Sequence, residues 1–402
     1  MNYQEQKTSP TKFDENAPLA GVRVLEFGHF AAGPYATMLL ADWGADVVKV
    51  EPPKGEPLRH WPPLVGEDGS PFGVNFAILN RNKRCVEIDL KDPDGLRRAK
   101  ELCKKADIIV ENYRPGVLGK LGLGFEDVVK TNPDIVFCSL TGYGQTGPFK
   151  DRGAFDVAIQ AASGIMSVTG EENGPPVKCG VALADYGTGA FAALACVTAL
   201  RRAEKTGQPG NVDVSMYSCM VSLANLQTSE YWGAGDVPKR LGSRHPKAAP
   251  YQAYLGSDGK WFILAAGSDR LWHRVCDVIG APELADDPKY KIAGARAENQ
   301  LELEKVLGNK FSQSPAGNWL RKFDLANVPA APINDYSEVV ESEHVRETNL
   351  VHQMKLPDGT LVPTVGNPVS LSGFDFGIFV DPADVGAHSD EVVADWVGKE
   401  HV

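Results

Sequence analysis

Asp185 is the residue whose neighbours point most directly to chemistry. It follows the apolar run Val181-Ala-Leu-Ala and precedes Tyr186-Gly-Thr-Gly at the start of a helical pattern. A structural role is available, because aspartate is a preferred N-cap residue. Gly187 and Gly189 weaken a first helical turn, however, and they would be understandable if backbone N–H groups faced a reacting carbonyl. The local pattern leaves a helix cap and a catalytic carboxylate equally open.

Two other stretches have residue types that suit a nucleotide-like anion. Gly28–Pro34 lies between a predicted strand and a predicted helix, and its small residues would let the backbone approach a ligand. Taken alone, a tight strand-to-helix turn is the better explanation. The second group is cationic with one tyrosine: Asn82-Lys83-Arg84, Lys91, Glu111–Gly116 and Lys120. Tyr113 could stack on an adenine while a cation contacts phosphate, and a solvated charged surface is the alternative.

Familiar catalytic signatures are absent or out of context. Gly142–Gly147 matches GxGxxG, but Pro148 and Asp151–Gly153 follow, so no helix opens where a pyrophosphate would bind. The sequence has no GxSxG, HExxH or P-loop, which excludes the corresponding hydrolase, protease and NTPase sites. The seven cysteines form no CxxC pair. We therefore expect reduced thiols, no metal site and no permanently bound cofactor.

The elements that must position these residues follow an α/β pattern. Short β-branched runs alternate with helical patterns in the first half of the chain, which predicts a parallel sheet. The predicted strands are Val22–Phe27, Val47–Glu51, Val86–Leu90, Ile108–Val110, Ile135–Leu140 and Val212–Ser215. The predicted helices are Tyr35–Trp43, Asp92–Ala106, Gly189–Arg202 and Met216–Tyr231.

The character of the chain changes near residue 232. Gly233–Pro250 is rich in Gly, Pro and basic residues, and Asp258-Gly259 suits a hairpin turn. Helices are expected near Leu271–Ile279 and Gly317–Asp324. The predicted fold is a large Rossmann-like parallel-sheet domain plus a smaller α+β domain. Its predicted parts are a flexible tail (1–17), the large domain (18–231), the small domain (232–330) and a segment returning to the large domain (331–402).

Composition and charge restrict the partners. The 402 residues carry a net charge of −11, which argues against a nucleic-acid surface. An anionic substrate would need a local basic patch. The sequence has no secretory or transit signal and no run of about 18 apolar residues, so we expect a cytoplasmic protein without a membrane span.

Taken together, several motifs resemble those of the class III CoA-transferase family. The similarity runs from Pro18 to about Phe374. Its markers are Leu19–Val24, Ala32-Gly33-Pro34, Leu40–Glu51, Asn82-Lys83-Arg84, Val110–Gly116 and Thr141–Pro148. The chain is most similar to the glutarate and succinyl-CoA-dependent members, including His245-Pro246 and Pro250–Ala253.

The resemblance implies a role for particular residues. Asp185 would be the catalytic nucleophile. The contacts implied for CoA are His29, Phe30, Ala32, Ile88, Lys91, Asn112, Tyr113, Lys120 and Met216. The acyl pocket would include Ala31, Phe155, Asp156, Gly242, Arg244 and His245. An acyl-CoA thioester and a carboxylic acid would be substrates, and the chain would form an interlocked homodimer or a hetero-oligomer with a related subunit.

The chemistry implied is exchange of CoA through a mixed anhydride and an aspartyl-CoA thioester. Aspartate has an ordinary pKa of about 3.9 and needs no general base at neutral pH, and we expect the helix N-terminus to keep Asp185 ionised. We predict succinyl-CoA as donor and a C4–C6 dicarboxylic acid or a substituted succinate as acceptor. The cations considered for its far carboxylate are His29, Arg240, Arg244, His245 and Lys247.

Positions at which this chain departs from the family pattern distinguish between the alternative substrates and functions. Formyl-CoA transferase has glutamine at the position of Ala31 and a glycine-rich loop at Gly242–Lys247, which speaks against oxalate and formate here. CoA-thioester racemases of the same fold carry a catalytic histidine where this chain has Phe155, and phenylalanine cannot move a proton. A non-catalytic subunit is the third possibility, against which the presence of Asp185 argues.

Overall fold

The computed structural model describes residues 15–66 and 71–398, and the predicted tail, 1–17, falls almost entirely outside them. The chain forms two compact units. The first extends to Ile165 and also contains Cys179–Ser229 and the chain from His344 onward. The second contains Met166–Lys178 and Glu230–Glu343. The sequence predicts boundaries after residues 231 and 330, whereas the second unit ends at Glu343 and includes a segment from before Asp185.

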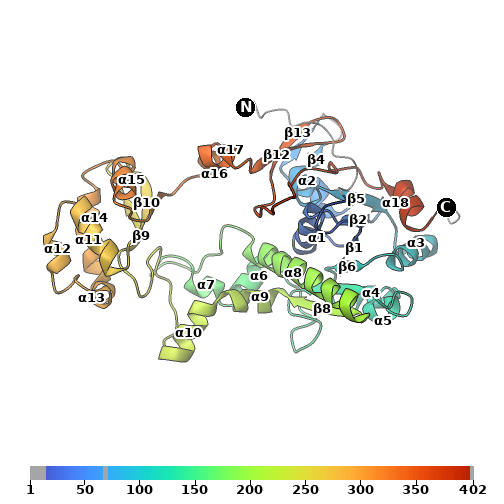
Figure 1. Ribbon diagram of the computed structural model, residues 1–402. Helices are drawn as coiled ribbons and strands as arrows, with labels where there is room; N and C mark the ends of the chain where they lie inside the picture. Colours follow the sequence, from blue (N-terminus) through green and yellow to red (C-terminus); the bar gives the residue numbers. More distant parts are fainter. Residues whose placement is uncertain (1–14, 67–70, 399–402) are drawn as a thin grey trace. The chain divides into compact units, whose positions relative to one another are not determined.

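A six-stranded parallel sheet is the centre of the first unit, as predicted (Figure 1). Its strand order is β5-β2-β1-β6-β7-β8. The strands are β1 (Arg23–Phe27), β2 (Asp46–Glu51), β5 (Lys83–Glu87), β6 (Ile108–Glu111), β7 (Val136–Thr141) and β8 (Gly210–Ser215). Strand β5 begins at Lys83 rather than at Val86, because the charged side chains at its start are buried by ion pairs that a hydrophobicity pattern cannot show.

Helices cover both faces of this sheet. Alternate strand residues face opposite sides, so Val24 packs in one core while Leu25 and Phe27 pack in the other. The first core is completed by α1 (Ala32–Asp42), α6 (Asp156–Ala162), α8 (Leu183–Thr206) and α9 (Met216–Leu223). The second is completed by α3 (Pro93–Cys103), α4 (Val117–Lys120), α5 (Phe125–Val128) and α18 (Ser389–Trp396).

Helix α8 packs closely on α1 through small residues. Buried Ala184, Thr188, Ala192 and Cys196 recur at every fourth position. A Cβ atom added to Gly189 would lie 2.8 Å from the carbonyl oxygen of Ala32, so this contact requires glycine. By length and composition α8 could cross a membrane, whereas the sequence predicted no such span. One face of α8 packs in the first core, and 39% of its apolar window is buried within this chain.

Two helix predictions need correction. Helix α8 begins at Leu183, before Asp185, and not at Gly189. The single helix predicted over Met216–Tyr231 is two helices, α9 and α10 (Asn225–Ala234), which separate at Ala224.

Short elements and the C-terminal region complete the first unit. They are η1 (Pro57–His60), β3 (Leu64–Val65), β4 (Phe72–Gly73), α2 (Val74–Leu79), β12 (Val351–Lys355) and β13 (Leu361–Val365). The β12–β13 hairpin packs on α2 through Met354, Val362 and Ala77. Two short helices, α7 (Ile165–Val168) and α17 (Glu343–Glu347), lie where the chain passes between the units.

The second unit is a small α+β structure with its own core. Its antiparallel sheet has the order β11-β10-β9, and Asp258-Gly259 forms the predicted hairpin turn between β9 and β10. The strands are β9 (Tyr251–Leu255), β10 (Trp261–Ala265) and β11 (Ala330–Pro332). The helices are α11 (Asp269–Val278), α12 (Glu283–Asp286), α13 (Ala293–Glu298), α14 (Gln300–Phe311), α15 (Ala316–Leu325) and α16 (Tyr336–Val340).

Candidate active site

Asp185 lies in the first turn of α8, but it is not the N-cap. Ala182 occupies that position and its side chain cannot cap the helix. Asp156, the first residue of α6, replaces the cap: its Oδ1 accepts hydrogen bonds from the backbone N–H groups of Ala184 (2.8 Å) and Asp185 (3.4 Å). Among the described residues, the carboxylate of Asp185 accepts no hydrogen bond. The cap alternative is therefore wrong, and this carboxylate is left unengaged.

The surroundings of Asp185 make it less acidic than expected. Burial, and secondarily the negative charge of Asp156, raise its pKa from 3.8 to about 6. A carboxyl group with this pKa is still ionised in roughly nine of ten molecules at pH 7. The carboxylate of Asp185 is therefore mostly ionised at neutral pH and mostly protonated in mild acid.

Asp156 is held in place by a buried amide. Gln160 Nε2 donates to Asp156 Oδ2 at 2.7 Å, and Gln160 Oε1 accepts from the backbone N–H of Cys179 at 2.8 Å. Gln160 is fully buried. Because both ends of the amide are used, Asp156 is fixed beside the first turn of α8.

The glycines after Asp185 serve packing. Gly189 allows the approach of α8 to Ala32, and a Cβ on Gly187 would lie 3.0 Å from Cε of Met220 in α9. Tyr186 packs edge-on against Tyr35 of α1, with ring centroids 4.9 Å apart. The start of α8 is thereby attached to the start of α1, directly after the β1–α1 loop.

That loop lies at the point where the strand order reverses. The chain passes from β1 to β2 and β5 on one side, then to β6, β7 and β8 on the other. Open α/β sheets bind ligands in the crevice at the carboxyl ends of the two strands flanking such a point. Here His29 N donates to Asn112 Oδ1 (3.0 Å), and Asn112 Nδ2 donates to the carbonyl of His29 (2.9 Å). The rings of His29 and Tyr113 are 5.4 Å apart.

Most of the residues predicted to contact CoA lie at this edge of the sheet. They follow β1 (His29, Phe30, Ala32), β5 (Ile88, Lys91), β6 (Asn112, Tyr113) and β8 (Met216), and Lys120 ends α4. His29, Phe30, Asn112 and Tyr113 are partly exposed, and Lys91 and Lys120 are exposed. Ala32, Ile88 and Met216 are buried in the cores, so each offers little surface to a ligand.

The cationic motif Asn82-Lys83-Arg84 has a different role from the one considered above. Lys83 is fully buried, with its Nζ 2.9 Å from Glu26 Oε2, and Arg84 pairs with Asp46 at 2.6 Å. These residues lie at the amino end of β5, opposite the crevice. They are internal ion pairs, neither phosphate ligands nor a solvated surface.

The predicted pocket residues fall in both units. Ala31 precedes α1 and is partly exposed, and Phe155 is 73% exposed directly before Asp156. Gly242 and Arg244 belong to the second unit, where they line a hollow of about 620 Å³. His245 is adjacent to them, and its ring lies 5.2 Å from that of Tyr251. Among the described residues, no group of acidic, His and Cys side chains could hold a metal ion.

The cations expected for a second carboxylate are largely occupied. Arg244 pairs with Glu172 and, at 3.5 Å, with Glu304. Lys247 pairs with Glu230 at 3.2 Å. Burial lowers the pKa of His29, which favours its neutral form. Arg240 differs: its Nη2 donates to the carbonyl of Gly174, and it makes no ion pair with any described residue.

Comparisons with known proteins agree with this arrangement. The model of CoA-transferase family III matches residues 19–389. Succinyl-CoA:glutarate CoA-transferase of Mus musculus is 37% identical over 382 residues, covering 94% of this chain and 86% of that protein. Succinate–glutarate CoA-transferase of Agrobacterium fabrum is 35% identical, covering 94% and 95%.

Solved structures give the same result. A CaiB/BaiF family protein from Brucella suis has a TM-score of 0.84 at 34% identity, covering 95% of this chain and 100% of that one. The sequence-based resemblance is confirmed: this chain is an enzyme that belongs to CoA-transferase family III.

Proposed function

We propose that this enzyme transfers CoA from succinyl-CoA to a dicarboxylic acid, with Asp185 as covalent nucleophile. The observation that carries the proposal is the unengaged carboxylate of Asp185, fixed by Asp156 at the start of α8. That helix contacts Ala32 at the end of the β1–α1 loop, which lies at the ligand-binding crevice of the sheet. A nucleophile and a CoA-binding loop are thus adjacent.

The reaction divides into two symmetric halves. The Asp185 carboxylate attacks the thioester carbonyl, forms a mixed anhydride and expels CoA thiolate. The thiolate attacks the aspartyl carbonyl, giving an aspartyl-CoA thioester and releasing the first acid, which carries away one aspartyl oxygen. The acceptor carboxylate attacks this thioester and expels the thiolate. The thiolate then attacks the acceptor carbonyl of the second anhydride, forming the new acyl-CoA and restoring Asp185.

The substrate assignment draws on the names of the relatives. Two of the relatives described above are named for succinyl and glutarate substrates, and a third, 36% identical, is named acetyl-CoA:oxalate CoA-transferase of Acetobacter aceti. All of these acceptors are dicarboxylates.

Matched acids test this proposal. With succinyl-CoA as donor, we expect glutarate to give a higher kcat/KM than butyrate. We also expect [¹³C]succinate to exchange into succinyl-CoA faster than propionate is converted to propionyl-CoA. Both comparisons are followed by mass detection of the CoA esters. Equal kcat/KM values for the monoacids would refute recognition of a second carboxylate.

We also propose that the enzyme acts as a cytoplasmic homodimer. Large apolar side chains on α8, α9 and α10 are exposed, including Leu194 (65%), Leu223 and Leu226 (68%). Such a concentration is typical of a protein interface. Mass photometry at nanomolar concentration should find dimers, and a population of monomers would contradict the proposal.

A further inference from the structure

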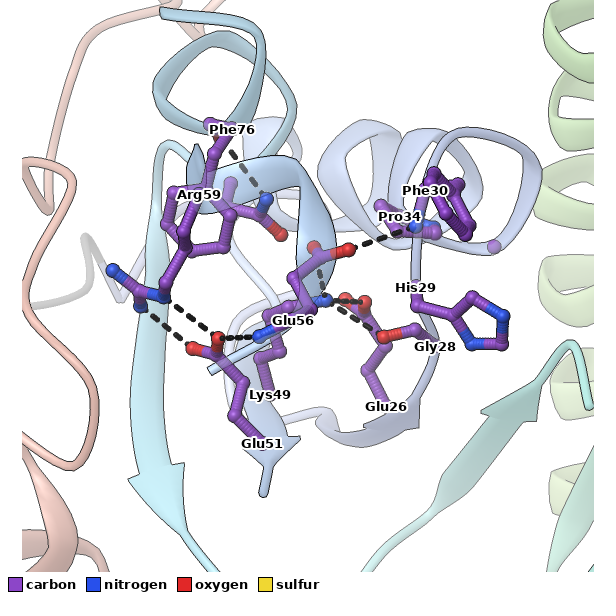
Figure 2. A network of polar contacts seen from close by, with 12 residues as sticks. Glu26, Gly28, His29, Phe30, Pro34, Lys49, Glu51, Glu56, Arg59 and Phe76 are labelled. Carbon is purple, nitrogen blue, oxygen red and sulfur yellow. Dashed lines mark hydrogen bonds and ion pairs between the residues drawn. The ribbon is translucent and has the colours of Figure 1, made fainter. Parts of the chain in front are cut away.

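The β1–α1 loop contains a residue in an unfavourable backbone conformation. Phe30 has φ = +60°, in the left-handed region that side-chain-bearing residues seldom adopt. The peptide N–H of Phe30 donates to Glu56 Oε2 at 2.8 Å (Figure 2). Asn112 holds the neighbouring His29 by two hydrogen bonds. The unusual turn is therefore stabilised by two side chains: Asn112 binds the backbone of His29, and Glu56 binds that of Phe30.

Glu56 is itself rigidly placed. It follows β2 and a turn at Gly55, where φ is +68°, and it is 2% exposed. Its backbone N–H donates to Glu51 Oε2 at 3.1 Å. Arg59 pairs with both oxygens of Glu51 (2.7 and 2.6 Å) and lies 3.8 Å from the centre of the Phe76 ring. The acceptor for Phe30 thus comes from a fixed segment.

A buried lysine joins this acceptor to the start of the loop. Lys49 Nζ lies 3.1 Å from Glu56 Oε1 and donates to Glu26 Oε1 (2.7 Å) and to the carbonyl of Gly28 (2.9 Å). The contact with Glu56 is an ion pair without hydrogen-bond geometry. Figure 2 shows Lys49 between the two glutamates, beneath the loop. Lys49 therefore fixes the first residue of the loop, while Glu56 fixes the third.

We propose that Glu56 is a positioning residue for CoA. Its carboxylate holds Phe30 in the left-handed conformation and thereby orients Phe30 and the following peptides toward the thioester end of the ligand. The inference rests on the proposed function, in which this loop binds CoA. Without the acceptor, the Phe30 N–H loses its partner and the loop populates ordinary φ values. Apparent affinity falls in proportion to the competent fraction.

Three variants separate positioning from stability. Glu56→Ala removes the acceptor. Glu56→Asp keeps a charge near Lys49 but withdraws the oxygen from Phe30 by one methylene. Asp42→Asn is the matched control, because Asp42 is an equally buried carboxylate, paired with Arg81 at 2.8 Å at the far end of α1. It should lower the thermal stability without touching the loop.

The measurements are CoA binding by calorimetry and amide hydrogen exchange of the peptide containing Phe30. We expect Glu56→Ala and Glu56→Asp to weaken CoA binding by about tenfold, or about 1.4 kcal/mol, and to accelerate exchange at Phe30. Asp42→Asn should leave both unchanged. Glycine tolerates a positive φ. In a Phe30→Gly background, Glu56→Ala should therefore accelerate amide exchange less than it does in the wild type.

The outcomes distinguish two kinds of failure. If the wild-type protein binds no CoA, the proposed function is wrong, and the exchange data alone decide whether Glu56 holds the loop. If the wild-type protein binds CoA and Glu56→Asp binds it equally well, the positioning role is overturned, even should Glu56→Ala fail to fold. Equal weakening by Asp42→Asn would also overturn it, since the effect would then be one of general stability.

Discussion

Replacing Asp156 by asparagine should shift the acid limb of the pH–rate profile downward. In the wild type, burial and the charge of Asp156 place the pKa of Asp185 at about 6. Asp185 is then ionised in roughly nine of ten molecules at pH 7 but roughly one in ten at pH 5. If it is the nucleophile, as proposed, kcat/KM should fall about tenfold between a plateau above pH 7 and pH 5. Asparagine removes one of the two causes and keeps an oxygen that can cap α8.

The sign of the change is determined by charge. Removing a neighbouring negative charge favours the ionised form of Asp185, so its pKa decreases, while burial keeps it above 3.8. The variant should therefore retain a larger fraction of its own plateau rate at pH 5. Its plateau will be lower, because Gln160 Nε2 loses an acceptor.

The assay is kcat/KM for succinyl-CoA at saturating glutarate between pH 4.5 and 8. The acceptor acid titrates identically with both proteins, so comparing midpoints cancels its contribution. A Gln160→Ala variant is the control, since it loosens Asp156 without removing its charge. An unchanged or raised midpoint in Asp156→Asn would refute the electrostatic coupling between the two carboxylates.

Three further predictions concern stability and specificity. Asp185→Asn should abolish transfer yet raise the free energy of unfolding at pH 8 by on the order of 1–2 kcal/mol, so the variant should unfold at a higher temperature than the wild type. Because the pKa of Asp185 is raised in the folded state, this gain should vanish below pH 4. A loss of stability at pH 8 would contradict the prediction. Glu26→Gln should cost about 3–5 kcal/mol in urea unfolding, since two buried lysines lose a partner; a cost below about 1 kcal/mol would show that the network relaxes. With Phe155 in place of a proton-transferring histidine, a 2-methylacyl-CoA incubated in D₂O should take up no deuterium at its α-carbon by mass spectrometry, and uptake would favour the racemase alternative.

The sheet was predictable because its signals are local. Each β-branched run and each following turn can be recognised within a few residues, and the parallel order follows from the alternating helices. Tyr113 was considered for nucleotide contact because it follows a predicted strand, whereas His29 and Asn112 were implied as CoA contacts by the resemblance to a known family. What brought them together with Asp185 was the resemblance to a known family rather than any spacing.

The buried ion network was not predictable in the same way. Lys49 stands between valines in a strand and Glu56 in a Gly-Pro-containing turn, and nothing in their spacing links them to Glu26. Their contacts join three segments that meet only in the folded chain. The cap on α8 is similar: Asp185 carries the residue type of an N-cap, but the capping group is Asp156 on another helix. Which residue caps a helix from another segment is determined by tertiary packing, which the local sequence does not show.

Transfer of oxygen from the acceptor acid to Asp185 tests the central claim most directly. In the proposed mechanism the second anhydride is bridged by an acceptor oxygen, and its cleavage by CoA thiolate leaves that oxygen on the aspartate. After turnover of succinyl-CoA with [¹⁸O]glutarate in unlabelled water, peptide mass spectrometry should find ¹⁸O on Asp185 and none on Asp156, and no label in Asp185→Asn. Product formation with an unlabelled Asp185, or with a label on another residue, would contradict nucleophilic catalysis by this carboxylate.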